Sequence, residues 1–442
     1  MRFVRTVLSI CGCGWLLAAC TAAGGVRSLP GMAVSPAQTG LVVRESILYS
    51  FRAGSDGSDP LSTLIADTSG ALFGTTDFGG SGSGCFGGCG TVFKLTPSHG
   101  NYVESVLYSF GGGTDGHGPA AGVISGPGGV LYGTTEYGGD TAGNGIVFKL
   151  TPSGSKYVES VLYRFKGGND GNGPLAGLTM DAAGNLFGAT LLGGGSPACG
   201  TTGSGNVGCG TIFELKPSGS GYSEHILHSF QSGSDGATPG SPPIIVGRVL
   251  YGTAATGGGK ASCGGAPINP GCGTIYKLTR ARGGYKFSTI YAFSGTPNDA
   301  ANPFAGLVRD NIGNFYGIGQ YGGAQNQGAV FELKPGPTES VLHSFSGGND
   351  GSYPLGSLAL AATGALYGTT QYGGSSRNAG IAFELTAARV ERVLFRFQQP
   401  AQGEYPVGGL LIHGKGVLIG TTSYGGTASA AAGTVFKLGL SR

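Results

Sequence analysis

Acidic side chains are the first residues of this sequence that could do chemistry. Asp77 follows Phe-Gly-Thr-Thr and Glu136 follows Tyr-Gly-Thr-Thr, and an aromatic residue comes directly after each of them. Two carboxylates at equivalent positions of neighbouring repeats could serve as a general acid and base, for instance on a glycan. We therefore select Asp77 and Glu136 as a candidate pair.

A second set of acids recurs along the chain and could suggest a ring of metal ligands. Its members are Asp56, Asp115, Asp170, Asp235, Asp299 and Asp350. Most of them stand directly before Gly, where Asp commonly builds a turn by bonding nearby backbone groups. We therefore expect turns at these positions, and we expect no metal ion and no cofactor.

Aromatic residues follow the Gly-Thr segment in several repeats and could stack on a sugar, or they could cap the junction between repeats. The residue before the aromatic position changes along the chain, so the fold does not require a particular side chain there. We take the following residues of these two positions as candidate binding residues: Asp77, Phe78, Glu136, Tyr137, Gln320, Tyr321, Gln371, Tyr372 and Tyr424.

Nine cysteines divide into an N-terminal group and three local pairs, which are Cys85 with Cys89, Cys199 with Cys209, and Cys263 with Cys272. The second member of each pair directly precedes Gly-Thr. An even number, short spacing and an exported chain favour disulfides. A zinc site is the alternative, but such a site usually needs four ligands, and no further Cys pair or His lies at motif spacing.

The N-terminus, MRFVRTVLSICGCGWLLAAC, has the layout of a secretory signal, with a basic start and an apolar run too short to span a bilayer. Its end, LAAC, resembles the lipobox of bacterial lipoproteins. That resemblance implies removal of residues 1–19 and acylation of Cys20, which would anchor the protein to a membrane. An ordinary cleaved signal with an incidental cysteine is the alternative. Residues 20–44 are interpreted as a flexible tether.

Composition excludes some classes of protein. The chain has 442 residues with 92 Gly and 22 Pro, only 11% of its residues are charged, and its formal net charge is +3. Sparse, balanced charge provides no basic surface for nucleic acid. The sequence contains neither a Gly-x-Ser-x-Gly nor a His-Glu-x-x-His motif, so these hydrolase signatures are missing.

Four short apolar runs recur in a fixed order seven times, as in AAGVIS, LYGTT, IVFKL and VLYRF. They are rich in β-branched and aromatic residues and are separated by Gly, Asn, Asp, Ser and Pro, a pattern that predicts strands. The repeat interval of 51 to 65 residues is too long for one coil of a β-helix. The sequence predicts an all-β protein, a seven-bladed β-propeller of four-stranded antiparallel blades over residues 45–438.

We expect the blades at about residues 61–110, 119–165, 174–230, 239–293, 303–345, 354–397 and 406–438, with a short tail at 439–442. The run at 45–51 has the sequence of an outermost strand, and the last repeat lacks one. We predict that this N-terminal strand completes blade seven and closes the ring. If the strands of a blade follow chain order outward, the loops after the second and fourth strands share one face, which we expect to bind partners.

The segments GNLFGAT, GVLYGTTEYGG, GTVFKLTPSHG and VLYSFGGGTDGHGPAAG resemble the GloVer (Gloeo/Verruco) repeat of exported bacterial tandem-repeat proteins. The resemblance covers roughly residues 45 to 438. It implies a propeller and an envelope or surface location, and it implies no activity and no catalytic residues.

We therefore expect a lipid-anchored cell-envelope propeller that binds a protein or glycan partner, or acts as a scaffold, through one loop face. Two alternatives stay open. One is a glycan-active enzyme that uses carboxylates specific to single blades. The other is a structural or adhesive surface protein without a small ligand.

Overall fold

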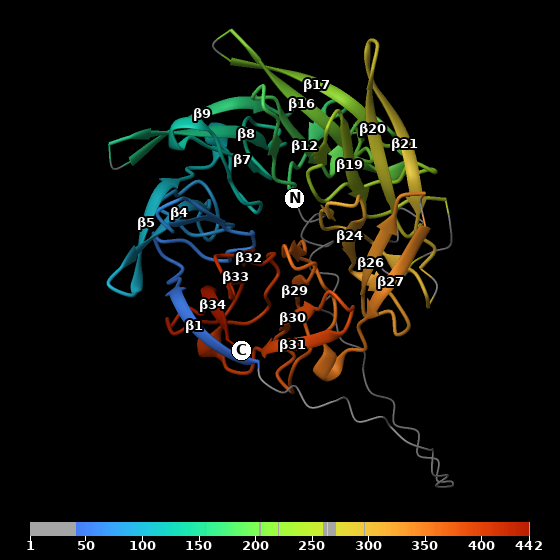
Figure 1. Cartoon of the computed structure of the whole chain (residues 1–442). Helices are drawn as coiled ribbons and strands as arrows, with labels where there is room; N and C mark the ends of the chain where they lie inside the picture. The colour runs from blue at the N-terminus through green and yellow to red at the C-terminus, as the bar shows by residue number, and fades with distance from the viewer. Residues whose placement is uncertain are drawn as a thin grey trace, which may run out of the picture.

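The structure, a computed structural model, describes residues 41–154, 156–202, 205–219, 221–259, 263, 271–295, 297–336 and 338–441. Seven four-stranded antiparallel sheets surround a common axis (Figure 1). This is the seven-bladed β-propeller that the sequence predicts. The signal peptide, Cys20 and the tether up to residue 40 lie outside the described residues. Within the described ranges, no helix is long and apolar enough to cross a membrane.

In blades one to six the strands follow chain order from the axis to the rim, whereas in blade seven the outermost strand comes from the N-terminus. Figure 1 shows the last strand of each blade at the rim. Blades one to seven contain, in this order, β2 (Ile65–Ala66), β3 (Leu72–Thr76), β4 (Thr91–Ser98), β5 (Asn101–Ser109); β6 (Ile124–Ser125), β7 (Leu131–Thr135), β8 (Ile146–Ser153), β9 (Lys156–Arg164); β11 (Thr179–Met180), β12 (Leu186–Thr190), β16 (Thr211–Ser218), β17 (Gly221–Ser229); β18 (Ile244–Val246), β19 (Val249–Ala254), β20 (Thr274–Ala281), β21 (Gly284–Ala292); β23 (Val308–Arg309), β24 (Phe315–Gly319), β26 (Ala329–Lys334), β27 (Thr338–Ser344); β28 (Ala359–Leu360), β29 (Leu366–Thr370), β30 (Ile381–Leu385), β31 (Glu391–Arg396); and β32 (Leu411–Ile412), β33 (Val417–Thr422), β34 (Thr434–Ser441), β1 (Val42–Ser50).

Smaller elements lie in the loops. The two-stranded sheets pair β10 (Gly171–Asn172) with β13 (Leu192–Gly193), β14 (Thr201–Thr202) with β15 (Gly205–Asn206), and β22 (Ala300–Ala301) with β25 (Tyr321–Gly322). Short 3-10 turns are η2 (Gly113–Asp115), η3 (Pro127–Gly129), η4 (Pro197–Cys199), η5 (Gly348–Asp350) and η6 (Pro400–Gln402).

The glycine of the Tyr-Gly-Thr-Thr segment is required by the strand beside it. A Cβ on Gly133 would lie 2.5 Å from the ring of Phe148, its partner on β8, and a Cβ on Gly368 would lie 2.6 Å from the ring of Phe383. Real Cβ atoms do not approach other atoms so closely. The missing side chain therefore lets an aromatic ring of the third strand cross the backbone of the second strand.

The two threonines of this segment form hydrogen bonds, the first to the next blade and the second within its own blade. The first donates its hydroxyl to the next blade: Thr134 Oγ1 donates to the carbonyl of Ala176 at 3.1 Å. The second bonds within its own blade: the hydroxyl oxygens of Thr190 and Thr211 are 2.8 Å apart. Because both hydroxyls are buried and bonded, the recurrence of Thr-Thr has a structural cause.

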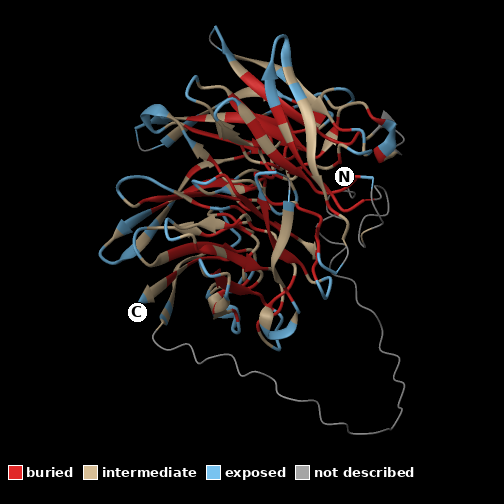
Figure 2. Ribbon diagram, turned by 45° about the vertical axis from the view of Figure 1, so that its right-hand side comes forward, coloured by how far each residue is buried: buried red, intermediate tan, exposed pale blue. Residues whose placement is uncertain are grey.

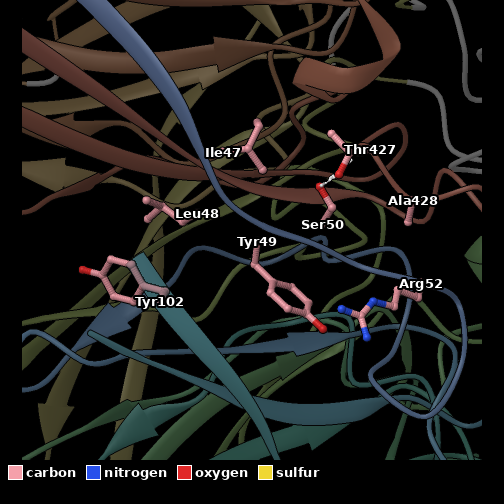
Figure 3. Close-up of a pocket in the computed structure, with 8 residues that line it drawn as sticks. All are labelled: Ile47, Leu48, Tyr49, Ser50, Arg52, Tyr102, Thr427 and Ala428. Atoms are coloured by element: carbon pink, nitrogen blue, oxygen red, sulfur yellow. Dashed lines mark hydrogen bonds between the residues drawn. The ribbon is translucent and has the colours of Figure 1, made fainter. Parts of the chain in front are cut away.

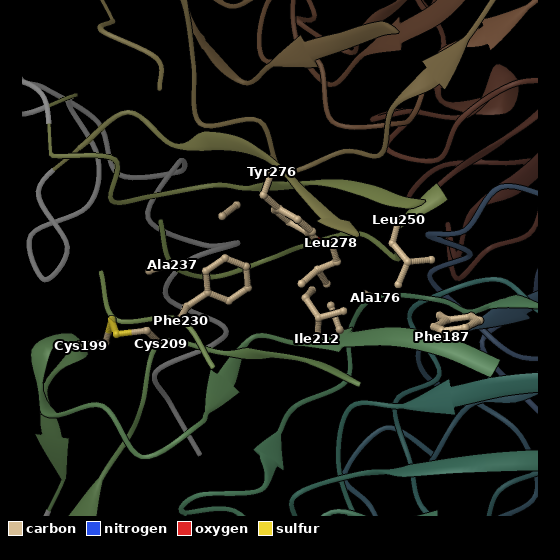
Figure 4. Packing of buried hydrophobic residues seen from close by; sticks show 12 residues of the cluster. Ala176, Phe187, Cys199, Cys209, Ile212, Phe230, Ala237, Leu250, Tyr276 and Leu278 are labelled. Atoms are coloured by element: carbon tan, nitrogen blue, oxygen red, sulfur yellow. A yellow bond between two sulfur atoms is a disulfide. The ribbon is translucent and has the colours of Figure 1, made fainter. Parts of the chain in front are cut away.

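The hydrophobic core lies between the blades, as the buried strands in Figure 2 show. The phenylalanine that ends each LYSF-like run is fully buried and meets the aromatic ring of the third strand of the next blade. Phe110 meets Phe148 edge-to-face with ring centroids 5.1 Å apart, and Phe230 meets Tyr276 at 5.6 Å. Figure 4 shows the cluster around Phe230 and Tyr276. Such aromatic pairs hold neighbouring blades together in addition to the area they bury.

The ring closes between the two ends of the chain. β1 pairs antiparallel with β34, so the N-terminal strand is the outermost strand of blade seven and the predicted closure is confirmed. Pairing extends from Val42 opposite Ser441 to Ser50 opposite Thr434. The strands therefore include residues that the sequence analysis assigned to the tether and the tail, because backbone pairing continues where the apolar pattern stops.

Candidate functional site

The loops after the second and fourth strands meet on one face of the propeller, which we call the loop face. Each blade has one antiparallel contact between the chain that enters it and the residue at its aromatic position. The pairs are Ser58–Phe78, His117–Tyr137, Asn172–Leu192, Ala237–Thr256, Ala301–Tyr321, Ser352–Tyr372 and Glu404–Tyr424. The predicted crowding of these loops on one side is therefore present in every blade.

The residue after the first member of each pair has a left-handed backbone. These residues are Asp59, Gly118, Gly173, Thr238, Asn302, Tyr353 and Tyr405, with φ between 53° and 69°. Gly and Asn adopt this region readily, whereas Thr and Tyr rarely do. Tyr353 and Tyr405, at φ 55° and 60°, therefore stand where the backbone favours glycine.

Backbone hydrogen bonds impose this conformation. The amide of Tyr353 donates to Gln327 of the preceding blade at 2.9 Å, and its carbonyl accepts from Gln371 at 3.1 Å. Tyr405 makes the same two bonds, with Ala379 and Ser423. The same two backbone bonds hold this position in every blade, and residues as different as Gly, Asp, Thr and Tyr occupy it.

Four tyrosines of blades five to seven form a continuous series of ring contacts on the loop face. We call Tyr321, Tyr353, Tyr372 and Tyr405 the tyrosine arc. Successive ring centroids are 5.3, 5.6 and 5.7 Å apart, with interplanar angles of 88°, 83° and 72°. All four side chains are half-buried, and Tyr424 at the next aromatic position is 50% exposed. The arc thus joins two predicted aromatic residues with two that the sequence analysis missed.

Polar groups accompany the tyrosine arc without adding net charge. Gln320 and Gln371 directly precede two of its rings and are half-buried. Arg377 Nε and Nη2 donate to Glu404 Oε1 at 2.9 and 2.6 Å, and Glu404 is only 5% exposed. This charge-assisted pair is locally neutral. The arc therefore offers aromatic faces, amides and hydroxyls.

The other candidate residues lie on the loop face in blades one and two. Asp77 and Tyr137 flank Gly118, since a Cβ there would lie 3.2 Å from Asp77 Oδ1 and 3.3 Å from the ring of Tyr137. His117 stacks on Tyr137 with centroids 5.3 Å apart, and burial lowers the pKa of His117, an effect that Asp115 partly opposes. Glu136 is 5% exposed, whereas Asp77 is half-buried. Because blade seven adjoins blade one, the predicted residues occupy five consecutive blades of the ring and are missing from blades three and four.

The recurring aspartates build turns, as the sequence analysis expects. Asp115 Oδ2 accepts the backbone amide of Gly111 at 2.9 Å and the hydroxyl of Tyr108 at 3.1 Å. Blade seven has no Asp at this position, and Gln402 accepts the amide of Gln398 at 3.2 Å instead. Among the described residues, no three His, Cys, Asp or Glu side chains gather as a metal site would require.

Three disulfides join Cys85 to Cys89, Cys199 to Cys209, and Cys263 to Cys272, which are the pairs expected from the spacing. Each second cysteine also supplies the carbonyl that holds the left-handed residue of the next blade; Cys209, for example, accepts from Thr238 at 2.8 Å. The disulfides therefore anchor the loop face in three blades. They also fit an exported protein, because such bonds persist in oxidising compartments.

A separate groove of about 660 Å³ lies at the rim, where the ring closes (Figure 3). It is lined by Ile47, Leu48, Tyr49, Ser50, Arg52, Tyr102, Thr427 and Ala428. Thr427 Oγ1 donates to Ser50 Oγ at 3.2 Å across it. None of the candidate binding residues lines this groove, so we treat it as the seam between blades seven and one.

The candidates selected from the sequence do not include Tyr353, Tyr405, His117, Arg377 and Glu404. A signal for the first two was present, because the left-handed residue precedes a proline in every blade, as in Tyr353-Pro354 and Tyr405-Pro406. Aligning the repeats on that proline exposes the variable position. The Arg377–Glu404 pair gives no such signal, because it joins loops of two blades.

Comparison with solved structures supports the fold. A streptogramin B lyase matches with a TM-score of 0.55 and 15% identity, over 92% of this chain and 100% of that chain. Virginiamycin B lyase from Staphylococcus aureus matches with a TM-score of 0.50 and 12% identity, over 90% of this chain and 99% of that chain. At such low identity these likenesses concern the fold alone. A search of curated proteins finds no significant match.

The repeats themselves carry a family signature. The family model described as the Gloeobacter/Verrucomicrobia repeat matches residues 21–268 and 262–442, which together include the whole propeller. This chain belongs to the Gloeobacter/Verrucomicrobia repeat family.

Proposed function

We propose that this protein is an exported binding module that holds a glycan chain against the tyrosine arc. The observation that carries the proposal is the pair Tyr353 and Tyr405, each in a backbone conformation that favours glycine. Strained residues persist where the surroundings over-determine them, and they cluster at ligand-binding sites. A large ring at this position is not explained by the turn, so we assign it to ligand contact.

The chemistry of the arc favours a sugar. A tyrosine ring offers an apolar face with a polar edge, which suits the C–H face and the hydroxyl groups of a pyranose. The amides of Gln320 and Gln371 can both donate and accept hydrogen bonds. The charges of Arg377 and Glu404 are paired with one another, so the arc favours a neutral ligand. Ring contacts that continue through three blades fit a chain better than a compact molecule.

A direct test is retention of the protein on arrays of envelope glycans and of envelope proteins. We expect retention on neutral glycans and a loss of roughly tenfold in affinity for Tyr372→Ala. Tyr102→Ala, at the rim, is the matched control and should bind like the wild type. Retention on proteins alone would overturn the glycan assignment, and retention on neither array would overturn binding altogether.

The N-terminal sequence supports a lipid anchor at Cys20 as part of this proposal. Cells fed a clickable fatty acid should label the wild-type protein and leave Cys20→Ala unlabelled. Equal labelling of both proteins would contradict acylation at this residue. Attachment to a membrane would hold the propeller at the envelope, where glycans are abundant.

Cleavage of the bound glycan is a second candidate function, favoured by the arrangement in blades one and two. The Nδ1 atom of His117 is buried and has no hydrogen-bond partner among the described residues, and the lowered pKa of this side chain favours a neutral ring that can accept a proton. Asp77 and Glu136 lie on the same face. Incubation of the protein with a glycan that it retains tests this function. Cleavage products formed by the wild type and not by Asp77→Asn or Glu136→Gln would support it, and a wild-type reaction without cleavage products would exclude it.

A further inference from the structure

Glutamates recur at one position of the outermost strands, outside the loop face. They are Glu45, Glu104, Glu159, Glu224, Glu339 and Glu391, each paired across the sheet with the leucine that ends the third-strand motif. In blade four Phe287 occupies this position, opposite Leu278. We call these six side chains the rim glutamates.

Every rim glutamate has one carboxyl oxygen, Oε1, that is buried and has no hydrogen-bond partner among the described residues. A buried carboxylate oxygen without a donor is costly, whereas a protonated carboxyl carries no charge and can itself donate. Because this buried, unpaired oxygen recurs in six blades, it is a property of the repeat and not of a single loop.

Each of five rim glutamates interacts electrostatically with an aspartate in the loop that leads into its own blade. Glu104 lies in the electrostatic range of Asp56, with Tyr49 and Arg52 beside them. The remaining groups are Glu159 with Asp115, Tyr108 and Arg164; Glu224 with Asp170, Tyr163 and Lys166; Glu339 with Asp299 and Tyr291; and Glu391 with Asp350, His343 and Arg396. Burial raises the pKa of Glu45, and among the described residues no aspartate contributes to that shift.

The aspartates of these junctions are held in place by other bonds. Asp56 Oδ2 accepts the Tyr49 hydroxyl at 2.8 Å and the amide of Arg52 at 3.1 Å. Asp170 Oδ2 likewise accepts from Tyr163 at 3.0 Å and from the amide of Lys166 at 2.8 Å. Electrostatic repulsion from these aspartates opposes a negative charge on the neighbouring glutamate.

We infer that the rim is a proton-dependent seam, in which the glutamates are protonated in mild acid and the junctions between outer strands weaken when they lose these protons. Deprotonation puts two negative charges side by side at five junctions and leaves a charged oxygen buried at each. The junction between blades three and four lacks this element, because Phe287 stacks on His228 with centroids 3.7 Å apart.

The direction of the pH effect follows from the pKa shifts. Burial, followed by repulsion from the neighbouring aspartate, raises the pKa of Glu104, Glu159 and Glu224 to about 7 from 4.5. Burial likewise raises the pKa of Glu339 to about 8 and of Glu391 to about 7. At pH values between the pKa of the unfolded state and the raised pKa of the folded state, the folded state binds more protons than the unfolded state. The contribution of these glutamates to stability is therefore complete below the unfolded-state pKa, and it is lost as the pH rises through the folded-state pKa.

Thermal unfolding at several pH values tests the seam. The wild type should have a Tm lower by roughly 5 to 10 °C at about pH 8 than at about pH 5. Glu→Gln at positions 104, 159, 224, 339 and 391 should remove most of that difference, and Glu159→Gln alone should remove part of it. The control, Glu332→Gln, breaks ion pairs to Lys334 and Arg389 and should lower the Tm at both pH values.

A second measurement follows the protonation of the rim glutamates directly by nuclear magnetic resonance. With carbon-13 at the side-chain carboxyl of glutamate, the rim resonances should titrate near neutral pH and vanish one at a time in single Glu→Gln variants. Titration of every rim carboxyl in the ordinary glutamate range, or a Tm that is flat or rising between these pH values, would overturn the inference.

Discussion

Ile47 of β1 lies opposite Phe436 of β34, so residues from the two ends of the chain share one blade. The backbone ladder between these strands and the burial of Phe51 against Phe93 of blade one both depend on this pairing. Loss of β1 would expose the edge of β34 and open the ring.

Deletion of residues 42–50 should therefore lower the Tm strongly or abolish cooperative unfolding. Deletion of residues 21–40 is the control, and it should leave the Tm within a few degrees of the wild type, roughly the effect of 1 kcal/mol. Circular dichroism during heating measures both. Equal Tm values for the two deletions would contradict closure by β1.

The aspartate turns give a second prediction. Asp115→Ala removes the acceptor of the Gly111 amide and the Tyr108 hydroxyl and should lower the free energy of unfolding by about 1 to 3 kcal/mol. Asp115→Asn keeps an acceptor oxygen and should lose less. Urea unfolding of both variants checks the order, and equal losses would show that the carboxylate oxygen is not the relevant acceptor.

The disulfides give a third prediction. Replacing Cys199 and Cys209 by Ser should lower the free energy of unfolding by about 2 to 3 kcal/mol, because their sequence separation of 10 closes a short loop. The same change at Cys85 and Cys89, whose separation is 4, should cost less. Denaturant unfolding without reductant measures both losses. A larger loss for the shorter loop would contradict loop closure as their main contribution.

The fold could be predicted from the sequence because its causes are local and repeated. Gly133 leaves space for the ring of Phe148, and the neighbouring threonines form hydrogen bonds to adjacent strands and blades. Each of these packing requirements recurs in the sequence as the same residue type. The outermost strand could be placed by counting strands at the two ends. Repetition therefore converts packing requirements into a visible pattern.

The candidate site could be predicted only in part, because its residues are those that depart from the repeat. Tyr321 and Tyr372 were found because they follow a recognisable strand. Tyr353 and Tyr405 follow no apolar run, and their left-handed backbone becomes evident only when the two loops are paired in space. The rim glutamates can be recognised in the sequence. The aspartates that interact with them lie earlier in the chain, in the loop that leads into each blade, so the interaction itself cannot be read from the repeat.

We assign Tyr353 and Tyr405 to ligand contact and not to the turn in which they lie. Gly118 and Gly173 occupy the same left-handed position in blades two and three, so glycine is compatible with this turn. Thr238→Gly makes the same change in blade four, outside the tyrosine arc, and is the matched control for binding.

The most direct measurement is the Tm and the glycan affinity of the double variant Tyr353→Gly, Tyr405→Gly, determined on the same preparation. We expect a Tm within a few degrees of the wild-type value, because relief of backbone strain of roughly 1 to 3 kcal/mol at each site offsets the lost ring contacts, together with an affinity at least roughly tenfold weaker. A Tm several degrees lower with unchanged affinity would contradict it and make the two tyrosines structural.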